Sequence, residues 1–115
     1  MVAMAQLIPE DPQEQASVLE VLRQHPELKT FIAKASAKAE QIFPGATMHL
    51  DTVQYDDWDP PVRLIIGAPM EQGAFMAVLE DFLGWLRNQS NYNRELILVF
   101  PKRIGRTEGF AHART

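Results

Sequence analysis

The sequence has no cysteine, no closely spaced pair of histidines and no long apolar run, and each absence excludes a class of protein. Without cysteine the chain cannot form a disulfide scaffold, a thiolate metal site or a cysteine nucleophile. No apolar run approaches the ~20 residues that cross a bilayer. The start, MVAMAQLIPEDP, also lacks the basic segment of a signal sequence. We therefore expect a cytoplasmic protein with no membrane partner and no cofactor.

Positive charge is scarce until the end of the chain. Residues 1–101 contain seven Lys and Arg against fourteen Asp and Glu, whereas residues 102–115 contain four against one. The body should repel nucleic acid and the end could attract it. A length of 115 residues, 46% of them apolar, suits one domain. We expect a single domain over 1–101 and a flexible basic tail over 102–115.

Three segments have the signals of helices. The residues DPQE, starting at Asp11, combine a capping acid, a proline in the first turn and a glutamate three positions after the cap. They predict a helix over 12–24. Apolar residues at helical spacing predict a second helix over about 26–43 and a third over about 71–88.

Three further segments are typical of strands, over 47–55, 62–66 and 95–100. The alternation in the first slips, which indicates a bulge or a strand covered on both faces, and Pro101 is expected to close the third. The order is then ααββαβ. The first two strands should pair as a hairpin and the last two should be parallel through a right-handed crossover. The predicted fold is α+β, a small three-stranded mixed sheet with helices packed on it.

The last two strands are apolar at successive positions, so helices on a small sheet would leave apolar surface uncovered. We expect a homodimer, or a protein partner bound through an uncovered face or edge of the sheet. The parity of the residues separates two groups: Val62, Leu64, Ile66, Leu96, Leu98 and Phe100 in one, and Ile65, Ile97 and Val99 in the other. The expected contact residues are Ile65, Ile97 and Val99, together with Tyr55 and Trp58 of the loop between the first two strands.

That loop, YDDWDPP, concentrates carboxylates. Clustered carboxylates bind divalent metal ions, so one hypothesis is a metal-dependent hydrolase or nuclease. Its ligands would be Asp51, Asp56, Asp57 and Asp59, with His49 as a base. The spacing does not match a calcium-binding loop, however, and no second acidic motif follows. The favoured interpretation is a turn, because aspartate and proline are turn residues, and no metal site.

Other chemistry finds little support. His49 and Asp51 share a strand face, as a general base and its orienting carboxylate would, but no nucleophile is placed beside them. A cross-strand pair of Asp51 with Arg63 is the simpler interpretation. Residues 67–73 lack the lysine of a phosphate-binding loop. The basic tail over 102–115 could bind nucleic acid only weakly.

The run AEQIFPGATMHLDTVQYDDWDPPVRLIIGAP, the helix with FMAVLEDFLGWL and the strand RELILVF resemble a group of small, mostly uncharacterised bacterial α+β proteins. The resemblance covers about residues 39–100. Some of these proteins are similar to components coded beside toxin–antitoxin or other regulatory partners, which implies a binding role. The sequence as a whole favours a non-enzymatic interaction or regulatory domain, with no catalytic residue assigned.

Overall fold

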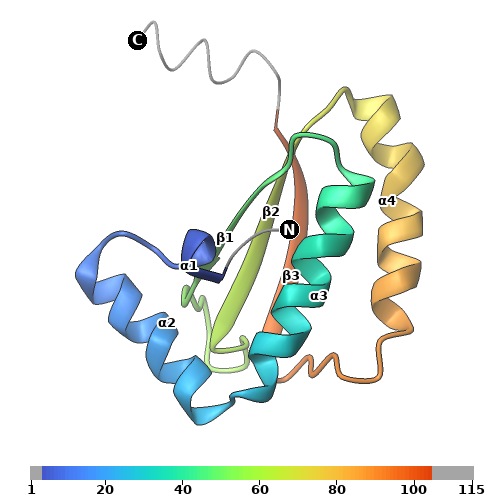
Figure 1. Cartoon of the computed structure of the whole chain (residues 1–115). Helices are drawn as coiled ribbons and strands as arrows, with labels where there is room; N and C mark the ends of the chain where they lie inside the picture. The colour runs from blue at the N-terminus through green and yellow to red at the C-terminus, as the bar shows by residue number, and fades with distance from the viewer. Residues whose placement is uncertain (1–3, 105–115) are drawn as a thin grey trace, which may run out of the picture.

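The fold is a three-stranded sheet with helices packed on it (Figure 1). The computed structural model describes residues 4–104. Strand β1 is antiparallel to β2, and β2 is parallel to β3, so the predicted α+β class and mixed sheet are confirmed. The elements are α1 (Met4–Leu7), α2 (Pro12–Gln24), α3 (Glu27–Ile42), β1 (Thr47–Asp51), β2 (Val62–Pro69), α4 (Gln72–Arg87) and β3 (Ile97–Ile104).

The helices begin and end close to the predicted residues, for the expected reasons. The Asp11 carboxylate accepts hydrogen bonds from the N–H groups of Gln13 and Glu14, at 3.1 and 3.0 Å, and so caps α2. Pro26 then occupies the N-cap of α3, where its missing N–H costs nothing. The short helix α1 was not predicted, because four residues are too few to show a periodicity.

The strands differ from the predicted ranges. Strand β1 ends at Asp51 and has no bulge, so Val53 and Tyr55 belong to the following loop. Strand β3 does not close at Pro101 but continues to Ile104. Since β3 is an edge strand, a residue that lacks an N–H is tolerated there. The first three residues of the predicted tail are therefore strand, and 105–115 lie outside the described residues.

The pairing of β2 with β3 also corrects the predicted grouping by parity. Val62 is opposite Ile97 and Leu64 is opposite Val99, so these even and odd positions share one face. Ile65 is opposite Phe100 on the other face. The two groups expected from the sequence are therefore mixed in the sheet.

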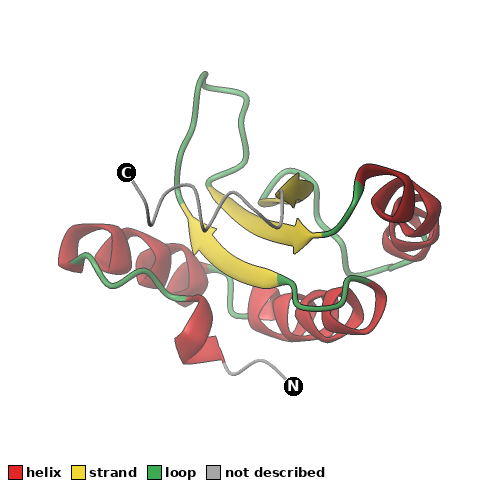
Figure 2. Cartoon of the chain, turned by 90° about the horizontal axis from the view of Figure 1, so that it is seen from above, coloured by secondary structure: helices red, strands yellow, loops and turns green. Residues whose placement is uncertain are grey.

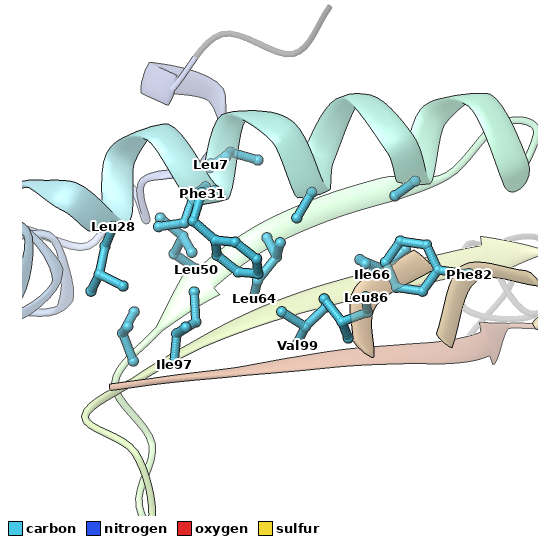
Figure 3. Close-up of a cluster of buried hydrophobic side chains, with 14 of the residues drawn as sticks. Leu7, Leu28, Phe31, Leu50, Leu64, Ile66, Phe82, Leu86, Ile97 and Val99 are labelled. Carbon is cyan, nitrogen blue, oxygen red and sulfur yellow. The ribbon is translucent and has the colours of Figure 1, made fainter. Parts of the chain in front are cut away.

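The core fills the space between the helices and one face of the sheet (Figure 3). Helix α3 lies along this face, with α2 and α4 to either side of it (Figure 2). Phe43, fully buried just after α3, has its ring 5.6 Å from that of Phe75 and 5.3 Å from that of Phe82, so it joins α3 to α4. None of the helices between residues 4 and 104 is long and apolar enough to cross a membrane.

The opposite side of the sheet is not covered by these helices (Figure 2). We call it the open face. Alternation along the paired strands assigns to it three groups of residues. They are Thr47, His49 and Asp51 of β1, Arg63, Ile65, Gly67 and Pro69 of β2, and Leu98, Phe100, Lys102 and Ile104 of β3.

Candidate interaction surface

The hairpin loop, residues 52–61, joins β1 to β2 and projects from the sheet on the side away from α3 (Figures 2 and 3). Two of its aspartates, Asp56 and Asp59, hold its backbone. One carboxylate oxygen of Asp59 accepts from the N–H groups of Tyr55 and Asp56, at 2.6 and 3.2 Å. The Asp56 carboxylate accepts from the N–H of Trp58 at 2.8 Å. This is the turn chemistry expected of aspartate.

The two aromatic side chains of the hairpin loop point into solvent. Trp58 is 92% exposed and Tyr55 is 82% exposed. The only ring contact found for them among residues 4–104 is that of the Arg63 guanidinium, which lies 5.9 Å from the centroid of the Tyr55 ring. An indole left almost wholly in water contributes nothing to the core, and two exposed rings on one short loop make that loop a candidate contact surface.

A two-pronged ion pair lies on the open face where the hairpin loop begins. Arg63 donates from Nε and Nη2 to the two carboxylate oxygens of Asp51, at 2.7 and 2.8 Å. Partial burial tends to raise the pKa of the Asp51 carboxyl. The hydrogen bonds from Arg63 and from the Val53 N–H, with the guanidinium charge, outweigh that effect and hold this pKa below its ordinary value of 3.8. The same hydrogen bond raises the pKa of Arg63.

The predicted association of His49 with Asp51 is weak. The His49 Nε2 atom lies 3.9 Å from the nearer Asp51 oxygen, and the imidazole is largely exposed. Because both Asp51 oxygens already accept from Arg63, the carboxylate does not orient the imidazole as a general base requires. The simpler interpretation, a cross-strand pair of Asp51 and Arg63, is confirmed.

Apolar side chains are exposed beside this ion pair. Leu98 is 40% exposed, although it sits between the core residues Ile97 and Val99, and Phe100 is 44% exposed. Val53 of the hairpin loop is 39% exposed. A hollow of about 170 Å³ lies between the loop and the sheet. Its lining residues are Val53, Tyr55, Asp59, Pro60, Arg63, Leu98 and Phe100.

Of the five residues expected to make contacts, some are exposed in the structure and others are buried. Trp58 and Tyr55 are at the surface, as a contact role requires. Ile65 is on the open face but only 4% exposed, and Ile97 and Val99 face the helices in the core. The exposed apolar positions of β3 are instead Leu98 and Phe100, which were expected in the other group. Correct pairing of β2 with β3 would have identified them.

The four aspartates of the metal hypothesis do not converge. Asp51 is paired with Arg63, and Asp56 and Asp59 accept from the backbone of the loop. Within residues 4–104 no three His, Cys, Asp or Glu side chains are grouped so that they could hold a metal ion. The described part of the chain therefore offers the hairpin loop and open face as its candidate site, and no set of metal ligands.

No family model, no curated protein and no solved structure matches the chain. The resemblance of residues 39–100 to small bacterial proteins stays a prediction. What the surface does must be argued from its own geometry.

Proposed function

We propose that the chain is a non-enzymatic interaction domain of the cytoplasm, acting in a regulatory pair, which binds a protein through its open face and hairpin loop. One observation carries the proposal. The exposed ring of Tyr55 and the exposed apolar side chains of Leu98 and Phe100 line one hollow, and the exposed ring of Trp58 lies on the same loop as Tyr55. The partner is a second copy of the chain or a different protein.

Physical chemistry favours covering these side chains. Removing apolar surface from water contributes about 25 cal/mol per Å², so a large aromatic ring gains roughly 1.5–3 kcal/mol on full burial. Tryptophan and tyrosine are also the residue types that most often dominate binding energy at the centre of interfaces. The Arg63–Asp51 pair adds a polar group whose charges are already balanced, so covering it strands no charge.

A catalytic role has less support. The alternative of a metal-dependent hydrolase needs free carboxylates that converge, and three of the four are engaged within the protein. Weak nucleic-acid binding through 102–115 concerns a segment that lies mostly outside the described residues. Neither gives a reason for the exposed Trp58.

The proposal can be tested by photo-crosslinking in cells. A benzophenone amino acid is placed at position 58, at position 100 or, as a matched control, at position 76, where Met76 is 54% exposed on α4. We expect adducts from positions 58 and 100 that are abolished by Leu98→Lys, and none from position 76. Equal labelling from all three positions, or no adduct from any, contradicts the proposed function.

A further inference from the structure

We propose that the occupant of the open face is a second copy of the chain, docked about a two-fold axis with the strands of the two sheets antiparallel. Each hairpin loop then lies over the far end of its partner's face. This inference rests on the proposed function and specifies its partner. The charge, shape and area of the open face support it.

The open face is electrically polar along its length. At the end with the hairpin loop, Asp57 is exposed and Asp56 adds a second carboxylate. At the other end Lys102 is exposed, opposite Gly67. Lys102 lies four residues beyond Leu98 along β3, about 13 Å at ~3.3 Å per residue. Between the two ends, Asp51 and Arg63 neutralise each other.

This polarity selects one arrangement of two copies. If two faces met with their strands parallel, the acidic loops would meet each other, and so would the two Lys102 side chains. With the strands antiparallel, the Asp57 of each copy approaches the Lys102 of the other, and two-fold symmetry provides the contact twice. Complementary charges of this kind fix the orientation of partners more than their affinity.

The end of the face beside Lys102 is shaped to receive a flat ring. Gly67 has no side chain, and a Cβ atom there would lie 2.9 Å from the Thr47 hydroxyl oxygen and 3.5 Å from Ile104 Cδ1. Those two side chains therefore border the Gly67 backbone from the two neighbouring strands. The result is a surface with no side chain at Gly67, edged by the Thr47 hydroxyl and the Ile104 side chain, on which the partner's Trp58 indole can lie. In return, the hollow beneath each hairpin loop faces the partner's Ile104 and the aliphatic stem of its Lys102.

The area requires the loop as well as the sheet. Three strands ~4.8 Å apart, the longer ones eight residues long at ~3.3 Å each, give a flat face of roughly 400 Å². A stable interface covers about 800 Å² on each partner. The deficit matches what two aromatic side chains supply, at about 150–250 Å² each. A dimer therefore needs Trp58 and Tyr55 to contact the partner, as the antiparallel arrangement allows.

Charge reversal with mixing tests this arrangement. In an Asp57→Lys homodimer, both contacts between positions 57 and 102 bring two positive charges together. In a Lys102→Glu homodimer, both contacts bring two negative charges together. In a mixed dimer of the two variants both contacts are attractive again. By sedimentation velocity on the full chain, we expect each variant alone to dimerise about tenfold more weakly than the wild type, and an equimolar mixture to recover the wild-type affinity. Glu80→Lys mixed with Lys34→Glu, on exposed positions of α4 and α3, is the matched control and should change nothing.

The outcomes separate this inference from the proposed function. A wild type that is still monomeric at about 200 µM would associate too weakly for a specific dimer. That result overturns the inference that the partner is a second copy. Adducts from position 58 with a different protein would then preserve the proposed function, whereas adducts with residues 105–115 of the same chain would overturn both. A wild-type dimer whose two variants do not recover on mixing overturns the antiparallel arrangement.

Discussion

The ion pair between Arg63 and Asp51 should stabilise the sheet measurably, because both side chains are mostly shielded from water. Their side-chain exposures are 18% and 16%. Arg63→Met keeps the length and apolar stem of the side chain but leaves the Asp51 carboxylate with one hydrogen bond, from the Val53 N–H, and the His49 imidazole 3.9 Å away. A shielded acceptor without its partner costs about 1–3 kcal/mol. We expect that loss in the free energy of unfolding.

A double-mutant cycle isolates the interaction. Asp51→Asn keeps the shape and the acceptor for the Val53 N–H while removing the charge. If the pair is coupled, Arg63→Met should cost less in the Asp51→Asn background than in the wild type, by about 1–2 kcal/mol for a two-pronged charged bond. The assay is urea unfolding at one low protein concentration, so that association does not contribute. A coupling energy indistinguishable from zero would refute the reasoning.

The same pair predicts a pH dependence whose sign follows from Asp51. Its pKa is lowered in the folded protein, so its stabilisation is complete above the ordinary carboxyl value of 3.8 and is lost as the pH falls through the lowered folded value. The difference in unfolding free energy between wild type and Asp51→Asn should therefore be constant near neutral pH and shrink only below that ordinary value. An exposed pair on α2, Glu20 with Arg23, provides the control, and Arg23→Met should leave stability unchanged. A difference that shrinks already at neutral pH would contradict the assignment.

Three further predictions concern the core, a helix cap and the hairpin loop. Phe43→Ala should lower the free energy of unfolding by about 3–5 kcal/mol, because it empties the contact of α3 with α4; a loss below that of Leu19→Ala, at a 48% exposed position, would contradict the packing. Asp11→Ala should cost about 1 kcal/mol in thermal or urea unfolding, and Asp11→Asn, which still caps, should restore most of it. Calorimetry with Mg²⁺ or Mn²⁺ at about 1–5 mM should show no binding heat, and heat that Asp57→Asn abolishes would revive the metal hypothesis.

The element order could be predicted from the sequence because its signals are local. Asp11 and Pro12 set the start of α2 through the backbone of one helical turn. The apolar periodicity identified α3 and α4, and the aspartates and prolines of the hairpin loop marked a turn between two strands. Such signals act over a few residues, so the sequence displays them whatever the rest of the chain does.

The parallel pairing of β2 with β3 was predicted, but its register could not be, because the register depends on how α4 and its connections return the chain to the sheet. The choice of face for Ile97 and Leu98 is made by that distant geometry, and both are apolar, so composition does not distinguish them. The residue at which β1 ends also depends on a distant contact. Asp51 stops the ladder where its carboxylate turns to Arg63 and to the Val53 N–H, and Arg63 is twelve residues away. The contact surface was consequently expected on partly the wrong residues of β3.

The aspartates of the hairpin loop have a consequence for binding that needs no metal. Association is weakened when a loop must be ordered, and a loop already held in its bound shape avoids that cost. Asp59 ties the backbone at Tyr55 and Asp56, and Asp56 ties it at Trp58, so the segment that carries both aromatic rings is fixed by its own side chains. The third carboxylate, that of Asp57, remains at the surface and accepts no hydrogen bond from the loop backbone. Two acids therefore shape the loop, and two rings supply apolar area for contact. The remaining acid makes one end of the surface negative, which favours one orientation of a partner over the other.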